Sequence, residues 1–361
     1  MSDFLQPREA VRRMAPYSPP SSGREGKLRL DFNENTVGCS PRVIEALAQY
    51  LTADHLSIYP EYAEATRKLA RFFEVETDEF ILSNGTDEAI QLLVNTFIEP
   101  GQEVLLLKPS YAMYRFYAEL AGASVREIES GEDLSFPLDR FIHAIQPDTR
   151  AILIANPNNP TGAALGHDQI RRILEAAPQA AVLIDEAYFE FFGVTVLGWI
   201  RDYPNLFVSR TFSKVYGIAA MRCGCLFSRS ENIRWIHKAQ SPYSVNMLAA
   251  VAACAAVEDP EYRKNYVEEV LAARKMVWDG LTRLGIRCYP TSANFILFYA
   301  GDRAIPIRDA LRDRGVLIRD RSYEIPGCVR VTIGTRAGAE RFLAELWRLW
   351  SAQPDRSVVR D

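Results

Sequence analysis

Short apolar runs alternate with helix-like stretches over the middle of the chain, and this alternation constrains the fold more than any other feature. The apolar runs have the length of strands and lie at residues 79–83, 103–107, 151–155, 181–184, 206–209 and 224–227. Helix-like stretches, such as residues 86–98 and 168–176, separate several of them. Buried apolar strands that alternate with helices are typical of a mostly parallel sheet flanked by helices. The sequence therefore predicts a large α/β domain with such a sheet.

A different pattern follows toward the C-terminus. A long helical tract over residues 246–284 is interrupted near residues 259–260, and it precedes strands at 294–299, 316–318 and 329–333 and helices at 307–314 and 339–350. This order predicts a smaller α+β domain. The first 30 residues are rich in Pro, Arg, Ser and Gly, so we expect an irregular arm with any helix confined to its first dozen residues. The expected division is an arm over residues 1–35 that packs with the small domain and the active site, a large domain over 36–242 and a small domain over 243–361.

Charge and composition exclude several kinds of partner. The formal net charge is -4 and basic residues do not cluster, so neither nucleic acid nor an anionic membrane surface is an expected partner. The longest apolar run, residues 247–257, falls short of the about 20 residues that a membrane span needs. The N-terminal 20 residues carry no apolar signal segment, and the cysteines and histidines lack the spacing of a metal site. We expect a cytoplasmic protein with reduced thiols and no bound metal.

Polar motifs follow four of the predicted strands. Ligands of open α/β sheets bind at the carboxyl ends of the strands, so these motifs are candidates for one common site. The first is residues 83–88 (Ser-Asn-Gly-Thr-Asp-Glu), where a strand ends and a helix opens. With Thr86 as the helix cap, the free N–H groups of the first turn form an anion site. The alternative is an ordinary strand-to-helix turn.

The second motif is residues 156–162 (Asn-Pro-Asn-Asn-Pro-Thr-Gly), directly after the strand at 151–155. Its prolines, asparagines and glycine make a rigid turn. Such rigidity suits an amide that must face a ligand, here that of Asn159, whereas a turn with no further role is the alternative.

The third motif begins with Asp185, directly after the apolar run at 181–184. A carboxylate at the end of a buried strand is costly without a cationic partner. A protonated pyridine nitrogen is such a partner, and its proton is what makes pyridoxal phosphate an electron sink. Tyr188, three residues later, is placed to reach the neighbouring ring hydroxyl. A salt-bridged or capping aspartate is the alternative.

The fourth motif surrounds Lys214, which follows the strand at 206–209. The hydroxyls of Thr211 and Ser213 precede it, and Arg222 lies eight residues later. A lysine amine forms Schiff bases with carbonyl compounds, and hydroxyls with an arginine supply donors for a phosphate. A single lysine is usually a solvated charge, so the prediction of a Schiff-base lysine rests on the groups around it.

The four motifs in this order resemble the fold-type I aminotransferases, and within them the histidinol-phosphate aminotransferase family. The gaps from Asn159 to Asp185 and from Asp185 to Lys214 each admit about one helix and one strand. The resemblance runs over nearly the whole chain and includes residues 31–35 (Asp-Phe-Asn-Glu-Asn), 59–60 (Tyr-Pro), 319–321 (Arg-Asp-Arg) and 329–335 (Val-Arg-Val-Thr-Ile-Gly-Thr).

The resemblance implies pyridoxal 5'-phosphate as the cofactor and a role for each matching residue. The catalytic residues would be Lys214 as the Schiff-base lysine and proton shuttle, Asp185 on the ring nitrogen and Tyr188 on the ring oxygen. Asn159 would bind the same oxygen, and Tyr111 would stack on the ring. The cofactor phosphate would be lined by Gly85, Thr86, Asp87, Thr211, Ser213 and Arg222.

The resemblance also implies the substrate contacts and the assembly. Arg330 would bind the carboxylate of glutamate or 2-oxoglutarate, with Asn159 nearby, and Arg319 and Tyr17 would hold the substrate phosphate. Tyr59 would reach the cofactor phosphate of the other subunit, which implies a homodimer.

The implied reaction converts L-histidinol phosphate and 2-oxoglutarate into imidazole-acetol phosphate and L-glutamate, a step of histidine biosynthesis. Two alternatives keep the cofactor: transamination of phenylalanine or tyrosine, and decarboxylation of threonine phosphate in cobalamin synthesis. A non-enzymatic regulatory protein is disfavoured because the chain has no spare domain or basic recognition helix. A nicotinamide enzyme is disfavoured because no G-x-G-x-x-G follows any strand.

Overall fold

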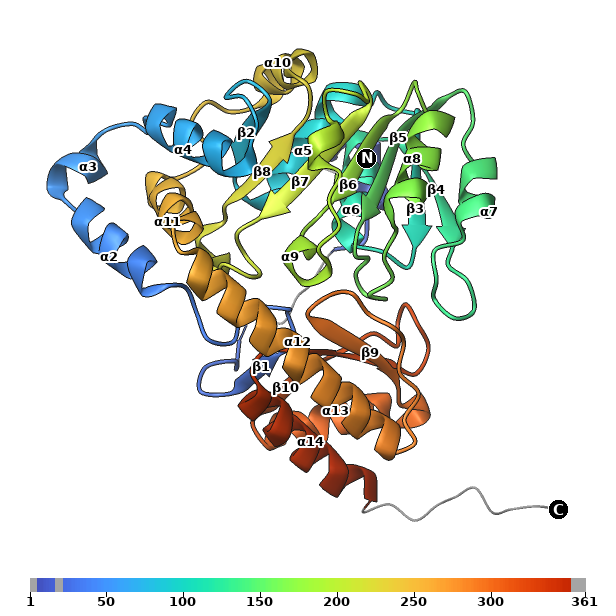
Figure 1. Cartoon of the computed structure of the whole chain (residues 1–361). Coiled ribbons are helices and arrows are strands. Elements are labelled where there is room, and N and C mark those ends of the chain that lie inside the picture. The colour runs from blue at the N-terminus through green and yellow to red at the C-terminus, as the bar shows by residue number, and fades with distance from the viewer. Residues whose placement is uncertain (1–4, 17–21, 352–361) are drawn as a thin grey trace.

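A seven-stranded sheet forms the centre of the larger part of the molecule (Figure 1). The computed structural model describes residues 5–16 and 22–351. In spatial order the strands are β2 (Phe80–Ser83), β8 (Gly224–Phe227), β7 (Leu206–Thr211), β6 (Ala181–Asp185), β5 (Thr149–Ala155), β3 (Glu103–Lys108) and β4 (Ser124–Glu129). The pairs from β7 to β4 are parallel, and β8 runs antiparallel to both of its neighbours. The predicted mostly parallel sheet is confirmed.

Helices cover both faces of this sheet, which explains why its central strands are mostly apolar on both faces. In β6, the side chain of Leu183 packs with one set of helices, whereas those of Val182 and Ile184 pack with the other. One face is covered by α5 (Gly85–Phe97), α6 (Ala112–Ala121) and α10 (Ser230–Ala239). The other face is covered by α4 (Ala63–Phe73), α7 (Leu138–His143), α8 (His167–Ala176) and α11 (Met247–Val257). The central strands therefore lack the polar alternation of a sheet with one wet face.

A second sheet of four strands forms the smaller part of the molecule. Its order is β1 (Leu28–Leu30), β10 (Val316–Asp320), β11 (Cys328–Thr332) and β9 (Phe295–Tyr299). The long helix α12 (Pro260–Arg283), with α13 (Ala304–Asp313) and α14 (Arg336–Ser351), packs on it (Figure 1). The predicted smaller α+β part is confirmed, while the division at residues 35 and 242 stays a prediction.

The predicted interruption near residue 259 is a pair of helix ends. Helix α11 ends at Val257, and α12 starts at Pro260 with Asp259 as its cap, whose carboxylate accepts a hydrogen bond from the backbone N–H of Tyr262. A capping aspartate followed by proline is a strong helix start. The direction of the chain therefore changes between α11, which packs on α2 (Pro41–Tyr50) and α4, and α12, which packs on α14.

Two strands were not expected from the sequence. Strand β4 is the edge strand and carries charged side chains, so it has no apolar run to mark it. Strand β1 lies within the expected arm and pairs in parallel with β10. Because β1 is tied into the small sheet, it fixes the position of the residues that follow it.

The remaining elements are short and lie at the surface or in connections: α1 (Glu9–Arg13), α3 (Ala53–Ser57), α9 (Phe189–Phe192), η1 (Leu197–Trp199), η2 (Ala219–Met221) and η3 (Gly301–Arg303). None of the described helices combines the length and the apolar character that crossing a membrane requires.

Candidate active site

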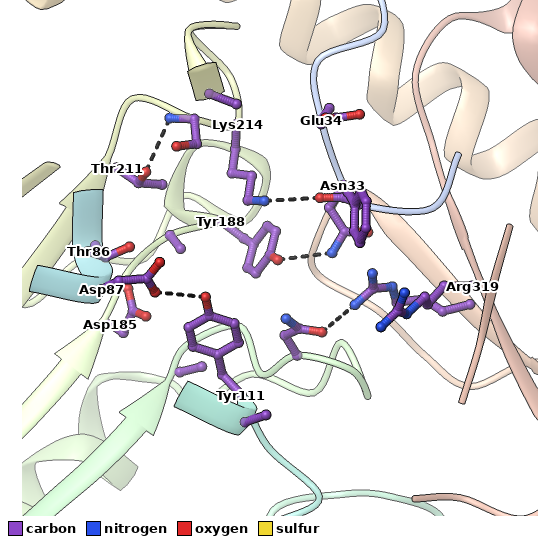
Figure 2. A pocket seen from close by; sticks show the side chains of 18 of the residues that line it. Asn33, Glu34, Thr86, Asp87, Tyr111, Asp185, Tyr188, Thr211, Lys214 and Arg319 are labelled. Atoms are coloured by element: carbon purple, nitrogen blue, oxygen red, sulfur yellow. Dashed lines mark hydrogen bonds between the residues drawn. The ribbon is translucent and has the colours of Figure 1, made fainter. Parts of the chain in front are cut away.

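The carboxyl ends of the parallel strands open into a cavity of about 280 Å³ (Figure 2). Its walls come from the loops of the large sheet, from residues 32–34 and from β10 and β11 of the small sheet. Most of the predicted site residues line it: Thr86, Asp87, Tyr111, Asn159, Asp185, Tyr188, Thr211, Ser213, Lys214, Arg222, Arg319 and Arg330. Gly85 lies against Arg222, Tyr59 lies away from the cavity, and Tyr17 lies outside the described residues.

The start of α5 shapes one end of the cavity. Gly85 has a φ of +73°, which favours glycine, and a Cβ at this position would lie 2.6 Å from Nη2 of Arg222 and would displace that guanidinium. Nη2 of Arg222 in turn donates to Oδ2 of Asp87 at 3.1 Å. Asn84 makes no side-chain cap, so the N–H groups of the first turn keep their capacity to bind an anion. Thr86 lies inside this turn rather than at the cap, which corrects the prediction.

The asparagine-rich turn after β5 is held by its own side chains. Nδ2 of Asn158 donates to the carbonyl oxygen of Pro109 at 3.0 Å and to Oγ1 of Thr161 at 2.9 Å. These bonds fix the turn and leave Asn159 free to face the cavity. Its amide oxygen accepts a hydrogen bond from Nη1 of Arg330, so the turn is linked to the small sheet.

Asp185 is a buried carboxylate at the end of the central strand β6. Its Oδ2 accepts a hydrogen bond from the hydroxyl of Tyr114 at 2.8 Å, and its Oδ1 accepts one from that of Ser209 at 2.9 Å. Burial raises the pKa of Asp185 to about 6, although both hydrogen bonds favour the ionised form. No ion pair joins Asp185 to a cation among the described residues. The carboxylate is therefore a site for a positively charged group of a ligand.

Lys214 follows a tight turn at the end of β7. The backbone N–H of Ser213 donates to Oγ1 of Thr211 at 3.1 Å, which fixes the turn. Nζ of Lys214 donates to the backbone carbonyl of Phe32 at 3.1 Å (Figure 2). The amine thus points into the cavity without a carboxylate partner in the described part of the chain.

Two tyrosines form further walls of the cavity. The hydroxyl of Tyr188 accepts a hydrogen bond from Nδ2 of Asn33 at 2.9 Å, and its ring centre lies 5.8 Å from Nζ of Lys214. The hydroxyl of Tyr111 donates to Oδ1 of Asp87 at 2.9 Å. Burial and the nearby carboxylate of Asp87 raise the pKa of Tyr111, so its hydroxyl stays protonated.

The small sheet contributes two cations that face each other across adjacent strands. Arg319 of β10 and Arg330 of β11 are register partners, and like charges at such positions are destabilising. Arg330 is buried and donates to the backbone carbonyl of Asp31 at 2.9 Å. Burial and the neighbouring arginines lower its pKa to about 10. Neither Arg319 nor Arg330 has a carboxylate partner among the residues described, so the pair can bind an anionic ligand.

Several residues of the cavity wall were not assigned a role from the sequence. Arg321 lines the cavity beside this pair, but its guanidinium is engaged by Glu324 and by the hydroxyl of Tyr323. Phe32 and Glu34 follow β1 and line the cavity as well. Residues 31–35 were recognised only as part of the family resemblance, because contacts across nearly 300 residues leave no local signal.

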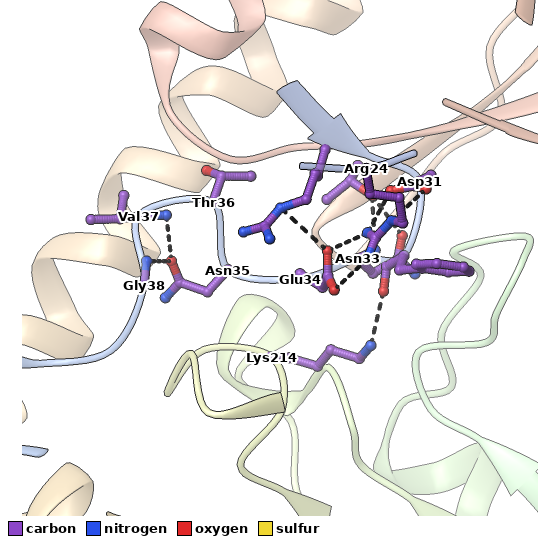
Figure 3. A network of polar contacts seen from close by, with 12 residues as sticks. Arg24, Asp31, Asn33, Glu34, Asn35, Thr36, Val37, Gly38 and Lys214 are labelled. Carbon is purple, nitrogen blue, oxygen red and sulfur yellow. Dashed lines mark hydrogen bonds and ion pairs between the residues drawn. The ribbon is translucent and has the colours of Figure 1, made fainter. Parts of the chain in front are cut away.

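An ion-pair network holds this N-terminal segment in place (Figure 3). Nη2 of Arg24 contacts Oδ1 of Asp31 at 2.8 Å and a carboxylate oxygen of Glu34. The guanidinium also lies over the ring of Phe32, 4.3 Å from its centre. The network therefore fixes the backbone carbonyl of Phe32, which accepts the hydrogen bond from Nζ of Lys214.

Comparison with known proteins shows the family to which the chain belongs. Residues 25–346 match the model of the family aminotransferase class I and II. The chain belongs to this family. Its members use pyridoxal phosphate, and within the family the chain belongs with the histidinol-phosphate aminotransferases. It is 36% identical to a protein named histidinol-phosphate aminotransferase from Symbiobacterium thermophilum, over 94% of this chain and 97% of that protein.

Solved structures have the same fold. The histidinol-phosphate aminotransferase from Sinorhizobium meliloti, solved in complex with pyridoxal 5'-phosphate, is 22% identical and has a TM-score of 0.88, with 97% of this chain and 99% of that chain covered. The histidinol-phosphate aminotransferase from Clostridium acetobutylicum is 25% identical with a TM-score of 0.83, and 90% of this chain and 100% of that chain are covered. The fold-type I assignment is thereby confirmed.

The buried charge of Asp185 gives a testable effect on stability. Its pKa is about 6 in the folded protein against 3.8 ordinarily, so the folded state binds more protons than the unfolded state between these pH values. The free energy of unfolding of the cofactor-free protein must therefore fall as the pH rises through this window. We expect Asp185→Asn to stabilise the cofactor-free protein by about 1 to 3 kcal/mol at pH 7.5, with a smaller gain at pH 4.5.

Urea unfolding of the two proteins at both pH values measures this difference. Glu190, whose pKa burial raises to about 7, is present in both proteins, so its titration cancels in the comparison. A variant that is no more stable than the parent at pH 7.5 would contradict the account of Asp185.

Proposed function

We propose that this chain is a pyridoxal-phosphate enzyme that transfers the amino group of L-histidinol phosphate to 2-oxoglutarate. The observation that carries the proposal is the arginine pair Arg319 and Arg330, which faces the cavity without carboxylate partners in the described residues. Both amino donors of this reaction are anionic, because histidinol phosphate carries a phosphate and glutamate carries carboxylates. A guanidinium pair binds phosphate and carboxylate alike, so one site can serve both half-reactions.

The donor set of the cavity fits pyridoxal phosphate. The open first turn of α5 and Arg222, which approaches Gly85 so closely that no Cβ fits between them, form a cradle for the phosphate. In the same cavity, the carboxylate of Asp185 lacks a cation in the described residues and matches a protonated ring nitrogen. Lys214 supplies an amine to this cavity. When bound, the cofactor supplies an electron sink for the bonds to the substrate α-carbon.

The residues around the proposed cofactor site have separate roles in the reaction. Nζ of Lys214 is the base that moves the proton of the substrate α-carbon, and the carbonyl of Phe32 orients it. Asp185 would hold the ring nitrogen protonated, and the hydroxyl of Tyr188 and the amide of Asn159, which line the same cavity, would donate to a ring oxygen. The buried position of Arg330 excludes water from the substrate carboxylate and strengthens its binding.

An amino-donor panel on the purified protein tests the proposed substrate. We expect turnover of histidinol phosphate with 2-oxoglutarate that exceeds that of phenylalanine by at least about tenfold in kcat/KM, because Arg319 and Arg330 bind its phosphate, which carries more negative charge than the carboxylate of phenylalanine. Arg319→Ala should reduce kcat/KM for histidinol phosphate more than for glutamate, whereas Arg330→Ala should reduce both. Good turnover of phenylalanine without turnover of histidinol phosphate would contradict the proposal, and release of carbon dioxide from threonine phosphate would point to the decarboxylase.

We also propose that the chain acts as a homodimer in which Tyr59 completes the partner's site. Tyr59 lies between α3 and α4, its side chain is 75% exposed, and its ring packs only against the exposed Tyr243 among the aromatic residues described, with ring centres 4.8 Å apart. Exposed apolar side chains also lie on α2, on α3 and directly after each of these helices, namely Ile44, Leu51, Leu56 and Ile58. An apolar surface that carries an exposed tyrosine is suited to a self-complementary interface.

Mixed dimers test this arrangement. Tyr59→Ala and Lys214→Ala should each lower the transaminase activity strongly when pure. After the two are unfolded, mixed in equal amounts and refolded, about a quarter of the sites should contain both Lys214 and a partner's Tyr59, and activity should return in that proportion. No recovery on mixing, with dimers present by light scattering, would show that Tyr59 does not act across the interface.

A further inference from the structure

Asp185 contacts a buried tyrosine, Tyr114, that does not itself line the cavity. Tyr114 is in the first turn of α6 and is fully buried. Its hydroxyl donates to Oδ2 of Asp185 at 2.8 Å, which is its one polar partner among the described residues. A buried tyrosine hydroxyl without a hydrogen-bond partner costs free energy because it has lost its contact with water. The hydrogen bond to the carboxylate of Asp185 offsets this cost.

Ser209 provides the matching contact on the other oxygen. It is the register partner of Asp185 on the adjacent parallel strand β7, and it is also fully buried. Its hydroxyl donates to Oδ1 at 2.9 Å. Each carboxylate oxygen therefore receives one O–H donor from a buried side chain, and rotation of the carboxylate is restricted.

The two hydroxyls favour the ionised carboxylate, because a hydroxyl that donates to an oxygen stabilises its negative charge. Burial acts in the opposite direction and raises the pKa of Asp185. A carboxylate has about four lone-pair positions, so the two hydroxyls and the backbone N–H of Ala187 leave capacity for one further donor. Asp185 lines the cavity, so that donor can be a group bound there.

We propose that Tyr114 and Ser209 are positioning residues that keep Asp185 ionised and oriented toward the ring nitrogen of the cofactor. The inference rests on the proposed function and deepens it, because it identifies the groups that control the protonation of this nitrogen. Neither residue lines the cavity, so both act through Asp185.

The ring of Tyr114 has a second contact that the test must separate from the first. It packs edge-on against Tyr111, with ring centres 5.6 Å apart and an angle of 87°. Tyr114→Phe keeps this contact and the volume of the core and removes only the hydroxyl. Ser209→Ala likewise removes one oxygen atom from the other side of the carboxylate.

The test compares the affinity of the cofactor-free protein for two ligands, pyridoxal phosphate and its 1-deaza analogue, in which carbon replaces the ring nitrogen. The analogue keeps the phosphate and the aldehyde that reacts with Lys214, but it has no N–H for Asp185. We expect Tyr114→Phe and Ser209→Ala each to weaken binding of pyridoxal phosphate by about tenfold, the effect of one hydrogen bond to a charged group. Binding of the analogue should change less than about twofold, because no contact with Asp185 is made.

Controls separate a positioning role from a structural one. Tyr117→Phe, on the same helix but outside the cavity wall and not bonded to Asp185, should bind both ligands like the parent. In an Asp185→Asn background, Tyr114→Phe should no longer alter the affinity for pyridoxal phosphate. An equal loss of affinity for both ligands, or no loss for pyridoxal phosphate, would overturn the inference. A parent protein that binds neither ligand would instead contradict the proposed function on which it rests.

Discussion

The site depends on charges that the fold buries without compensating them. Asp185 is a carboxylate without a cation among the described residues, and Arg330 is a buried guanidinium without a carboxylate among them. Each arrangement costs free energy in the empty protein; the protonated ring nitrogen of the proposed cofactor would relieve the first, and the anion of the proposed substrate the second. The unpaired charges of the protein therefore indicate which charged groups its ligands carry.

The two sheets place these charges at a common cavity. The carboxyl ends of the parallel strands carry Asp185 and Asn159, as expected for an open α/β sheet. The antiparallel pair β10 and β11 carries Arg319 and Arg330. The N-terminal segment joins the two parts, because β1 pairs with β10 and the carbonyl of Phe32 receives the Lys214 amine (Figure 3). The substrate site proposed on the small sheet and the amine of Lys214 are therefore linked through one short segment.

The sequence predicted those parts of the fold and the site that have a local signature. Strands β2, β5, β6 and β8 are apolar runs bounded by turns, and the motifs that follow strands supplied Asn159, Asp185 and Lys214. The edge strand β4 was missed because its charged side chains mask it, and β1 was missed because its partner lies far along the chain. Tyr114 was missed for the same reason: its contact with Asp185 joins residues 71 positions apart, and its surroundings look like those of any aromatic helix residue.

The central claim is that Lys214 holds the cofactor in the cavity bounded by Asp185 and Arg222. Borohydride reduction of the holoenzyme followed by peptide mapping by mass spectrometry tests it most directly, because reduction makes the link between lysine and cofactor permanent. The account predicts loss of the visible absorbance and a single modified peptide that carries the reduced cofactor on Lys214, with no such peptide from Lys214→Ala. A cofactor attached to another lysine, or a protein that traps none, would contradict it.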